Sequence, residues 1–473
     1  MPDMSLKKYP IPTQDAKERI NNFGEVETGY DLQTAKNEAE RCLNCKHKPC
    51  ATKGCPVQND IPAFIEQIRQ GNIAKAYEII SRTSNLPAIC GRVCPQEKQC
   101  EKYCVRGIKG EPVGIGRLER FVADWYYQNC QQKEEIPTPN GKSVAIVGSG
   151  PAGLTCAADL AKMGYSVTVY EALHTTGGIL TYGIPEFILP AKVVEREISS
   201  LRSLGVKFIT NAVVGKTLTI DDMFAEGFSA VFVGNGSATP KFMGIEGENL
   251  NGVYSANEFL MRVNLMNAYD EKFDTPLLHA KKYVVVGGGN VAMDAARCAI
   301  RFGAKVTIVY RRSRDELPSR ADEVVHAEEE GIEFKLLTNP VKIIGDENFF
   351  VKGIECVEMT LGEPDESGRR SPIEKPNSNF VIDTDCVIMS IGTGSSDLVV
   401  ASTYGIQTDK KGNIIVDENG MTTRLGVFAG GDAVTGPATV ILAMDAGKTA
   451  AKGIDNYLKN KNDLQNKKNI RLV

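Results

Sequence analysis

The pattern of apolar and polar positions changes character after residue 135. Residues 1–135 are polar overall, and their apolar residues recur at helical spacing in stretches such as 61–68 and 73–80. From Ser143 onward, short β-branched runs alternate with helical patterns, which is the order expected of βαβ units around a parallel sheet. The pattern therefore predicts an N-terminal all-α part followed by an α/β part.

The α/β part contains an internal repeat at a fixed offset of 139 residues. At this offset the run 144–147 falls on 283–286 and Gly148 falls on Gly287, with a helical pattern after each copy and no gap. A repeated unit of strand, glycine turn and helix indicates two dinucleotide-binding folds in one chain.

The first copy carries a complete dinucleotide fingerprint. Gly148 suits a tight turn, Gly150 lets the backbone approach a pyrophosphate, and Gly153 allows close packing of helix on strand. The next strand ends at Glu171, whose carboxylate suits the ribose hydroxyls of an unphosphorylated adenosine. A glycine-rich turn without a ligand is the alternative, but strand, helix and terminal acid agree. The fingerprint also includes Pro151 and Ala152.

The second copy differs where the adenosine ribose would lie. Its second strand is followed by Arg311 and Arg312 in place of an acid. Guanidinium groups suit a ribose 2′-phosphate, which a carboxylate would repel. The pattern therefore assigns this copy to NADPH, with a solvated basic turn as the alternative. The candidate NADPH-binding residues are Gly287, Gly289, Asn290, Val291, Ala292, Arg311 and Arg312.

If the second copy holds NADPH, the first fits FAD, and later segments support this. A Gly-Gly pair ends at Gly178, shortly after Glu171, and a strand near the C-terminus runs into Gly431 and Asp432. A helical stretch, 438–448, follows and can direct its N-terminal dipole at a flavin ring. The further FAD candidates are Gly178, Gly431, Asp432 and Thr439.

This order of segments resembles the flavoprotein family with two dinucleotide-binding domains, in which the NADPH domain is inserted between two halves of the FAD domain. Disulfide reductases of the thioredoxin reductase kind belong to that family and need a redox Cys-x-x-Cys beside the flavin. The only such spacing here joins Cys42 and Cys45, far upstream, so that subclass is not expected.

Eight of the thirteen cysteines fall between Cys42 and Cys104. Their order is Cys42-x2-Cys45-x4-Cys50-x4-Cys55-Pro56, then Cys90-x3-Cys94-Pro95-x4-Cys100-x3-Cys104. Eight cysteines with Cys-Pro steps are typical of two [4Fe–4S] clusters. Zinc ribbons are the alternative, but the second set lacks their paired Cys-x2-Cys.

The whole chain resembles the glutamate synthase small (beta) subunit family. The same module forms the N-terminal part of dihydropyrimidine dehydrogenase and the large subunit of NADH-dependent ferredoxin:NADP oxidoreductases. The motifs that carry the resemblance are CLNC (42–45), Cys55-Pro56, LPAICGRVCP (86–95), GRLERF (116–121) and GSGPAG (148–153).

The resemblance implies a ligand set for each cluster. One cluster would take four cysteines, Cys42, Cys45, Cys50 and Cys104. The other would take three cysteines and a carboxylate, Cys55, Cys94, Cys100 and Glu119. Cys90 would then be structural, although spacing alone does not choose Glu119 over Cys90. Four residues separate Cys50 from Cys55, where the family is expected to have three.

The expected architecture is α/β with an N-terminal all-α iron–sulfur domain and two Rossmann-like domains. We expect a helical domain with two [4Fe–4S] clusters at 1–135, an FAD domain in two parts at 136–265 and 391–473, and an inserted NADPH domain at 266–390. Hydride would pass from NADPH to FAD, and single electrons through the clusters to a partner. That first step needs no acid, base or nucleophile from the protein, so no catalytic side chain is assigned.

Composition and charge exclude some other function classes. The chain has 473 residues, 24% of them charged, and a net charge of −4, which gives no support to a nucleic-acid partner. Residues 1–10 do not resemble a signal peptide, and no run of 18 apolar residues occurs. A cytoplasmic protein without a membrane partner is expected.

The sequence leaves the electron acceptor open. Nothing in the chain resembles a glutaminase or an FMN-binding barrel, so a partner is required. The leading hypothesis is the NADPH-oxidising subunit of glutamate synthase, which works with a larger catalytic subunit. The alternative enzyme is the large subunit of an electron-bifurcating ferredoxin:NADP oxidoreductase, with ferredoxin or a second flavin-carrying subunit as partner. A redox-sensing cluster module without enzymatic activity is the alternative from another class.

Overall fold

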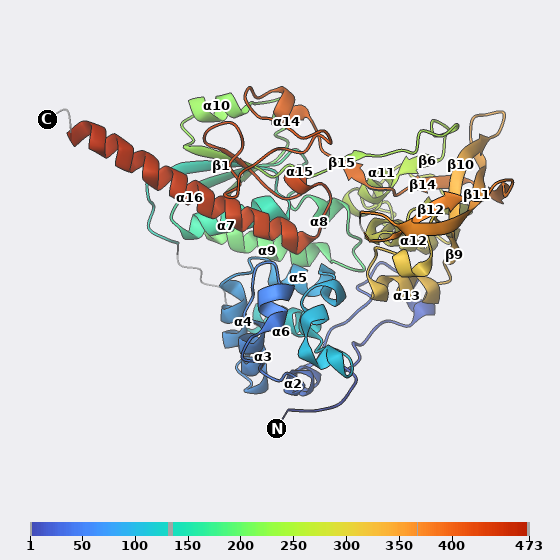
Figure 1. Ribbon diagram of the computed structural model, residues 1–473, viewed down its shortest axis with the longest axis horizontal. Helices are drawn as coiled ribbons and strands as arrows, with labels where there is room; N and C mark the ends of the chain where they lie inside the picture. Colours follow the sequence, from blue (N-terminus) through green and yellow to red (C-terminus); the bar gives the residue numbers. More distant parts are fainter. Residues whose placement is uncertain (1, 131–135, 367, 471–473) are drawn as a thin grey trace.

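The computed structural model describes residues 2–130, 136–366 and 368–470, with side chains up to residue 460. Figure 1 shows three parts: a helical part in blue and two parts that are each built on a parallel sheet. The expected boundary between residues 135 and 136 borders the stretch 131–135, which lies outside the described residues.

The N-terminal part consists of short helices joined by loops. Their apolar faces meet in one core around fully buried side chains such as Phe64, Ile68, Ile80 and Leu118. The elements are α1 (Ala16–Arg19), α2 (Leu32–Glu40), the π-helical turn η1 (Cys50–Gly54), α3 (Ile61–Arg69), α4 (Ile73–Ser81), α5 (Pro87–Val93), the 3₁₀ turns η2 (Gln96–Lys98), η3 (Glu101–Tyr103) and η4 (Val105–Ile108), and α6 (Ile115–Asn129).

The first sheet is parallel with the strand order β16-β4-β1-β2-β3. Its central strands are β-branched and buried on both faces, as parallel sheets require. Its elements before the second sheet are β1 (Ser143–Val147), α7 (Pro151–Lys162), β2 (Ser166–Tyr170), α8 (Ile179–Tyr182), α9 (Ala191–Ser203), β3 (Lys207–Ile209), α10 (Ile220–Ala225) and β4 (Ala230–Val233). Those that return to it from the C-terminal end are α14 (Leu398–Ala401), β16 (Val427–Ala429), α15 (Asp432–Thr435) and the long α16 (Val440–Ile470), which packs along α7 (Figure 1).

The second sheet is also parallel and has the order β6-β14-β7-β8-β9. Its elements are β6 (Val253–Ser255), α11 (Ala256–Leu260), the π-helical turn η5 (Met261–Leu265), β7 (Lys282–Val286), α12 (Asn290–Arg301), β8 (Lys305–Tyr310), the 3₁₀ turn η6 (Arg314–Glu316), α13 (Ala321–Glu329), β9 (Glu333–Leu336) and β14 (Cys386–Met389). Strand β6 lies before the expected boundary at residue 266, yet it pairs in this sheet with β14.

An antiparallel sheet is inserted between β9 and β14. Its strands are β10 (Thr338–Gly345), β11 (Val351–Pro364), β12 (Arg370–Glu374) and β13 (Phe380–Asp383), and it forms the orange edge of Figure 1. A small ribbon of β5 (Thr239–Pro240) and β15 (Thr393–Gly394) connects the two sheet parts.

The two parallel sheets repeat one topology, with β1 and β7 in equivalent places. The predicted fold, a helical part followed by two Rossmann-like units, is therefore confirmed. The difference lies at the outer strand: β16 reaches the first sheet from the C-terminal end, whereas β6 precedes the second unit in sequence. The chain thus leaves the first unit, completes the second and returns.

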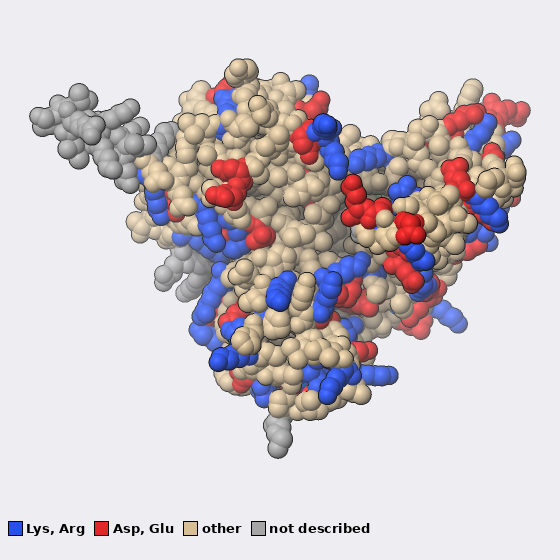
Figure 2. All heavy atoms as spheres, viewed as in Figure 1, with Lys and Arg blue, Asp and Glu red and all other residues tan. Residues whose placement is uncertain are grey.

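Two further observations concern the apolar length of the helices and the distribution of surface charge. None of the described helices is long and apolar enough to cross a membrane. On the face that Figure 2 shows, acidic and basic side chains are intermixed over all three parts. That face lacks the basic stripe typical of a nucleic-acid-binding surface.

Candidate functional site

The turn between β1 and α7 is shaped by three glycines. A Cβ on Gly148, whose φ is +95°, would lie 2.5 Å from the carbonyl oxygen of Gly234, and one on Gly153 would lie 2.0 Å from that of Gly148. Both positions need glycine for the packing of the protein itself. Gly150 differs, because a Cβ there would meet nothing within 4 Å. It leaves open space at the N-terminus of α7, where backbone N–H groups favour an anion.

The carboxylate of Glu171 lies directly behind this turn. The residue is 6% exposed and accepts hydrogen bonds from the backbone N–H (2.9 Å) and the hydroxyl (2.5 Å) of Ser149, and from the N–H of Leu173 (2.9 Å). The Ser149 hydroxyl oxygen accepts in turn from the N–H of Gly177 at 2.9 Å. Because a carboxylate has about four acceptor positions, the anchored acid can still accept from ribose hydroxyls. Our sequence analysis missed Ser149, which a polar residue between the two glycines could have signalled.

Segments far apart in sequence meet at the start of α7. A Cβ on Gly178 would lie 3.0 Å from the Cα of Gly150, and one on Gly431 would lie 2.9 Å from the Cβ of Ala152. Asp432 follows Gly431 at the start of α15, and burial raises the pKa of its carboxyl group. The structure therefore brings the candidate FAD residues of the first unit and of the C-terminal end together at one helix N-terminus.

The helical part reaches the same place from the other side. The side-chain amide of Gln99 donates to the hydroxyl of Thr439 at 3.3 Å, immediately before α16 begins. Thr439 thus lies between the cysteine-rich region and the helix that follows the Gly431-Asp432 turn.

The second unit repeats the glycine turn at the start of α12. Gly287 has a φ of +140°, and a Cβ on it would lie 2.2 Å from the carbonyl oxygen of Ser390. Gly289 is the N-cap of α12, and its Cβ would have no neighbour closer than 4.0 Å. The side-chain oxygen of Asn290 accepts from the N–H of Arg320 at 2.8 Å. Of the other two fingerprint residues, Val291 is exposed and Ala292 is buried.

The two arginines after β8 occupy different environments. Arg311 is exposed, and no residue in the described ranges forms a hydrogen bond or ion pair with it. Arg312 is only 5% exposed and pairs with the Asp365 carboxylate at 2.5 Å. Glu316, on the 3₁₀ turn η6, pairs with Arg370 at 2.5 Å.

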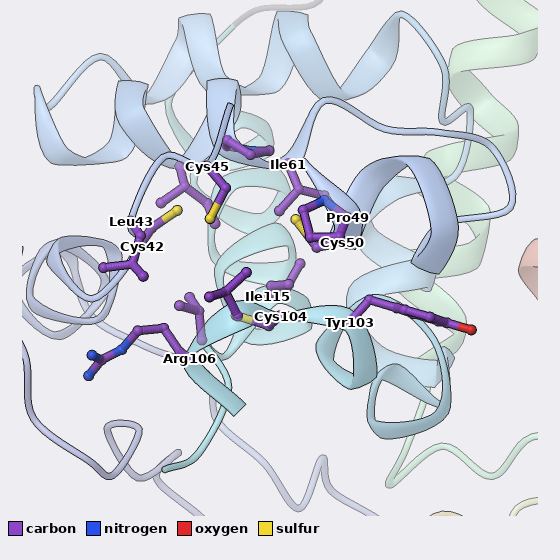
Figure 3. A pocket seen from close by; sticks show the side chains of 14 residues that line it. Cys42, Leu43, Cys45, Pro49, Cys50, Ile61, Tyr103, Cys104, Arg106 and Ile115 are labelled. Atoms are coloured by element: carbon purple, nitrogen blue, oxygen red, sulfur yellow. The ribbon is translucent and has the colours of Figure 1, made fainter. Parts of the chain in front are cut away.

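Four of the cysteines line one pocket in the helical part. Figure 3 shows their sulfur atoms around a common space, while Tyr103 points away from it. The four are Cys42, Cys45, Cys50 and Cys104. Burial raises the pKa of the Cys42 thiol to about 11 and that of Cys50 to about 12. These thiols become thiolates only beside a positive partner, so the donor set fits an iron–sulfur cluster.

A second group, formed by Cys55, Cys94, Cys100 and Glu119, lies closer to the first sheet than the four cysteines of the pocket do. Burial raises the pKa of the Cys55 thiol to about 12, and the Glu119 carboxylate contributes to the rise. Burial also raises the pKa of Cys100 well above its usual value, with contributions from Glu101, Cys55 and Glu119. Cys94 is buried beside the same groups. Cys55, Cys94 and Cys100 thus all lie close enough to Glu119 for its charge to contribute to the raised pKa of each thiol.

The carboxylate of Glu119 has no protein partner among the described residues. Burial, and then the charge of Glu197, raise its pKa to about 8. A partly buried carboxylate without a protein partner, beside three thiols, is a donor set that fits a cluster ligand. Nowhere in the described ranges do three His, Cys, Asp or Glu side chains converge on a single-ion site. In a [4Fe–4S] cluster, by contrast, each thiolate binds a different iron atom.

Cys90 lies between this second group and the first sheet. It is 1% exposed, and its sulfur lies 3.4 Å from the sulfur of Met444 on α16. The Ser84 hydroxyl donates to the same sulfur at 3.9 Å. Cys90 therefore lies at the packed contact between α5 and α16, and its thiol also forms a hydrogen bond with Cys94 of the second group.

Glu197 is a buried acid at the same contact that our sequence analysis missed. It lies on α9 and accepts from the N–H of Ala88 (2.8 Å) and from the hydroxyl of Tyr127 (2.7 Å). Burial raises its pKa to about 7. No sequence pattern signals this residue, because its partners are 109 and 70 positions away.

Comparison with protein families gives two matches that follow the division seen in the fold. Residues 19–131 match the family described as dihydropyrimidine dehydrogenase domain II, 4Fe-4S cluster. Residues 142–447 match the pyridine nucleotide-disulphide oxidoreductase family. The first range contains both cysteine groups, and the second contains both glycine turns.

Several relatives are similar over nearly the whole chain. The glutamate synthase [NADPH] small chain of Halomonas elongata is 39% identical over 94% of this chain and 95% of its own length. The protein of the same name from Escherichia coli is 36% identical over 96% and 98%. The NADPH-Fe(3+) oxidoreductase subunit beta of Geobacter sulfurreducens is 38% identical over 95% of this chain, which is 69% of its own.

A solved structure supports the fold of the two sheet parts. FprA from Mycobacterium tuberculosis, in complex with NADPH, superposes with a TM-score of 0.57 at 22% identity. The match covers 68% of this chain and 86% of FprA. At this identity the likeness shows the shared fold.

Proposed function

The chain belongs to the glutamate synthase small-chain family and is an NADPH-dependent iron–sulfur flavoprotein oxidoreductase; on this premise we propose that it is the NADPH-oxidising subunit of a glutamate synthase. In this proposal the first unit holds FAD, the second holds NADPH, and the helical part holds two [4Fe–4S] clusters. We further propose the division into 1–135, 136–265 with 391–473, and 266–390, although the pairing of β6 favours an earlier start of the inserted unit.

Each bound group has a set of residues proposed to hold it. Gly150 and the N-terminus of α7 face the FAD pyrophosphate, Glu171 takes the ribose, and Asp432 takes the ribityl chain. Gly289 and α12 do the same for the NADPH pyrophosphate. One cluster lies among Cys42, Cys45, Cys50 and Cys104, and the other among Cys55, Cys94, Cys100 and Glu119.

When bound, FAD exchanges a hydride from NADPH for single electrons that the clusters carry. The contribution of the protein is to hold the bound groups in position and to exclude water from them. Glu171 is held by Ser149 so that its orientation is set before a ligand arrives. The Gln99 amide and the buried Cys90 keep the cysteine region against α16. No side chain of the chain is required as an acid or base.

One observation carries the proposal: the segment 90–100, which bears Cys94 and Cys100 of the second cysteine group, lies against the helix that follows the Gly431-Asp432 turn. The contact of Cys90 with Met444 and the bond of Gln99 to Thr439 both cross this boundary. The pocket lined by the first cysteine group belongs to the core of the helical part. This arrangement favours an electron route from the first dinucleotide-binding unit to the second cysteine group, then to the first cysteine group and finally to a partner.

The proposed partner is a larger catalytic subunit. The name of the Escherichia coli relative, a small chain of glutamate synthase, supports such a partner, and we propose that both act in the cytoplasm. A second candidate function is delivery of NADPH electrons to a different acceptor. The 38% identity to an NADPH-Fe(3+) oxidoreductase subunit, which is longer than this chain, favours that alternative.

The proposal is tested by anaerobic purification with iron, sulfide and flavin quantified, followed by titration with NADPH. We expect about eight irons and one FAD per chain, and bleaching of the flavin by NADPH in preference to NADH. Adding the large chain of a glutamate synthase together with glutamine and 2-oxoglutarate should then give glutamate formation. Zinc in place of iron, or a flavin that NADPH does not reduce, would overturn the oxidoreductase proposal.

The choice between Glu119 and Cys90 as ligand has its own matched pair of variants. Glu119→Ala should lower the iron content by about one cluster, whereas Cys90→Ala should keep it and loosen the contact with α16. Iron content and the electron paramagnetic resonance spectrum of the reduced protein report the result. Loss of iron in Cys90→Ala alone would reverse the two roles.

A further inference from the structure

The loop after β8 is covered by a hairpin that lies more than fifty residues later in the chain. The Nε of Arg312 donates to the carbonyl oxygen of Arg370 at 2.8 Å, and its Nη2 pairs with Asp365 at 2.5 Å. Arg370 is the first residue of β12, and Asp365 follows the end of β11. The buried Arg312 therefore fastens this hairpin to the end of β8.

The guanidinium of Arg370 is directed back over the same loop. Its Nε pairs with a Glu316 carboxylate oxygen at 2.5 Å, and its Nη2 donates to the Ser313 hydroxyl at 3.2 Å. The side chain is 46% exposed, so its remaining N–H groups face solvent. Arg370 is thus oriented by two residues of the loop and retains free donors.

Both carboxylate oxygens of Glu316 are occupied by its own neighbours. Its other carboxylate oxygen accepts from the backbone N–H and hydroxyl of Ser313. Hydrogen bonds from Arg370 and Ser313 hold the pKa of Glu316 below its ordinary value. The acid therefore positions Arg370, while Arg311 contributes a positive charge that no described residue neutralises.

In a Rossmann-like unit the residues after the second strand lie beside the adenosine ribose. We propose that Arg370 and Arg311 together form the subsite for the ribose 2′-phosphate, and that Arg312 and Glu316 hold Arg370 in place. This inference rests on the proposed binding of NADPH to the second unit. It assigns cofactor specificity to a residue that sequence reasoning did not select.

The test measures binding of NADP⁺ and NAD⁺ to the oxidised holoenzyme by isothermal titration calorimetry. Arg370→Gln removes the guanidinium, and Arg370→Lys keeps a charge without the forked donors. The matched control is Arg314→Gln, an exposed arginine in the same loop whose side chain pairs with Glu328 instead. Flavin content and thermal unfolding verify that each variant is folded.

We expect Arg370→Gln to bind NADP⁺ about tenfold or more weakly and NAD⁺ unchanged, because one charge-assisted contact to the phosphate is lost. The affinity of Arg370→Lys for NADP⁺ should lie between those of the wild type and Arg370→Gln, and the affinity of Arg314→Gln should match that of the wild type. The affinity for the probe 2′,5′-ADP, which carries the phosphate without nicotinamide, should change across the variants in the same way as the affinity for NADP⁺.

Two outcomes separate this inference from the proposed function. If the wild type prefers NADP⁺ and Arg370→Gln keeps that preference, or loses both cofactors equally, the role of Arg370 is refuted and the NADPH site stands. If the wild type binds both cofactors equally, the assignment of the second unit to NADPH fails, and the subsite fails with it.

Discussion

The two dinucleotide-binding units share one topology but treat the adenosine end of the ligand differently. In the first unit Ser149 holds Glu171 behind the glycine turn. In the second, Gly288 replaces the serine and Tyr310 replaces the acid, and a Cβ on Gly288 would lie 2.7 Å from the tyrosine ring. The ring thus fills the place of the carboxylate and its anchor. The comparison shows that the same fold can place the polar groups for the adenosine end of the ligand either at the end of the second strand or in the loop that follows it.

The two units also attach to the helical part by different forces. The first shares a continuous apolar core with α5, around Cys90 and Met444. The second adds to the apolar contacts of Phe23 and Val26 a buried ion network, in which Glu330 pairs with Arg19 from the N-terminal segment and with Arg297 and Arg301 from α12. An apolar contact depends little on pH, whereas a charge network depends on every partner being present.

Replacing Glu330 by Gln is expected to have the largest effect on this comparison. The substitution leaves buried arginines without their shared carboxylate, and breaking such a network costs about 3–5 kcal/mol. Calorimetric unfolding should show the second unit destabilised while the flavin of the first unit is retained. The matched control is Glu328→Gln, whose partner Arg314 is exposed and whose loss should cost about 1 kcal/mol or less. Equal losses of unfolding free energy in Glu330→Gln and Glu328→Gln would contradict a stabilising role of the buried network.

The same network predicts an acid dependence. Burial alone would raise the pKa of Glu330, but hydrogen bonds and charges from Arg297 and Arg301 lower it to about 2. Because this folded pKa lies below the ordinary value of 4.5, the stabilisation is complete above about pH 4.5 and is lost as the pH falls towards 2. The difference in unfolding free energy between wild type and Glu330→Gln should shrink over that range. A difference that stays constant with pH would rule out this carboxylate as the source.

The glycines at the two helix starts give a pair of variants that act on one ligand each. Gly150→Ala and Gly289→Ala introduce methyl groups with open space around them, so both proteins should keep their stability. The methyl group should instead impede the pyrophosphate, at about 1–3 kcal/mol. We expect Gly150→Ala to lose FAD, and Gly289→Ala to keep FAD and weaken NADPH binding. Loss of flavin from Gly289→Ala would show that the two turns are not independent.

A smaller effect is expected from Arg311→Gln. An exposed arginine contributes one charge-assisted contact, so its removal should raise the KM for NADPH about tenfold and leave that for NADH unchanged. The corresponding change in the first unit, Glu171→Gln, should weaken the binding of FAD and leave the KM for NADPH unaffected. An Arg311→Gln enzyme with unaltered preference for NADPH would shift the phosphate contact to other residues.

Much of the fold could be predicted because its signals are local. The spacing of Gly148, Gly150 and Gly153 between a β-branched strand and a helix describes one turn, and its repetition at Gly287 describes a second. The outer strands could not be placed in the same way. Strand β6 lies on the first-unit side of the expected boundary, because pairing with β14 is a contact across more than a hundred residues.

The amino-acid sequence by itself determined the two-unit architecture, the Cys-rich helical part and the family, since strand, turn and cysteine spacings are encoded over short distances. Cysteine spacing alone did not choose the partners that the resemblance implied; the tertiary structure lines one pocket with Cys42 and Cys104 and places Glu119 where its charge acts on Cys55. It also decided that Arg312 is buried while Arg370 returns to the end of β8. These contacts join residues whose separation in sequence is set by loops, and only long-range packing selects which side chains meet.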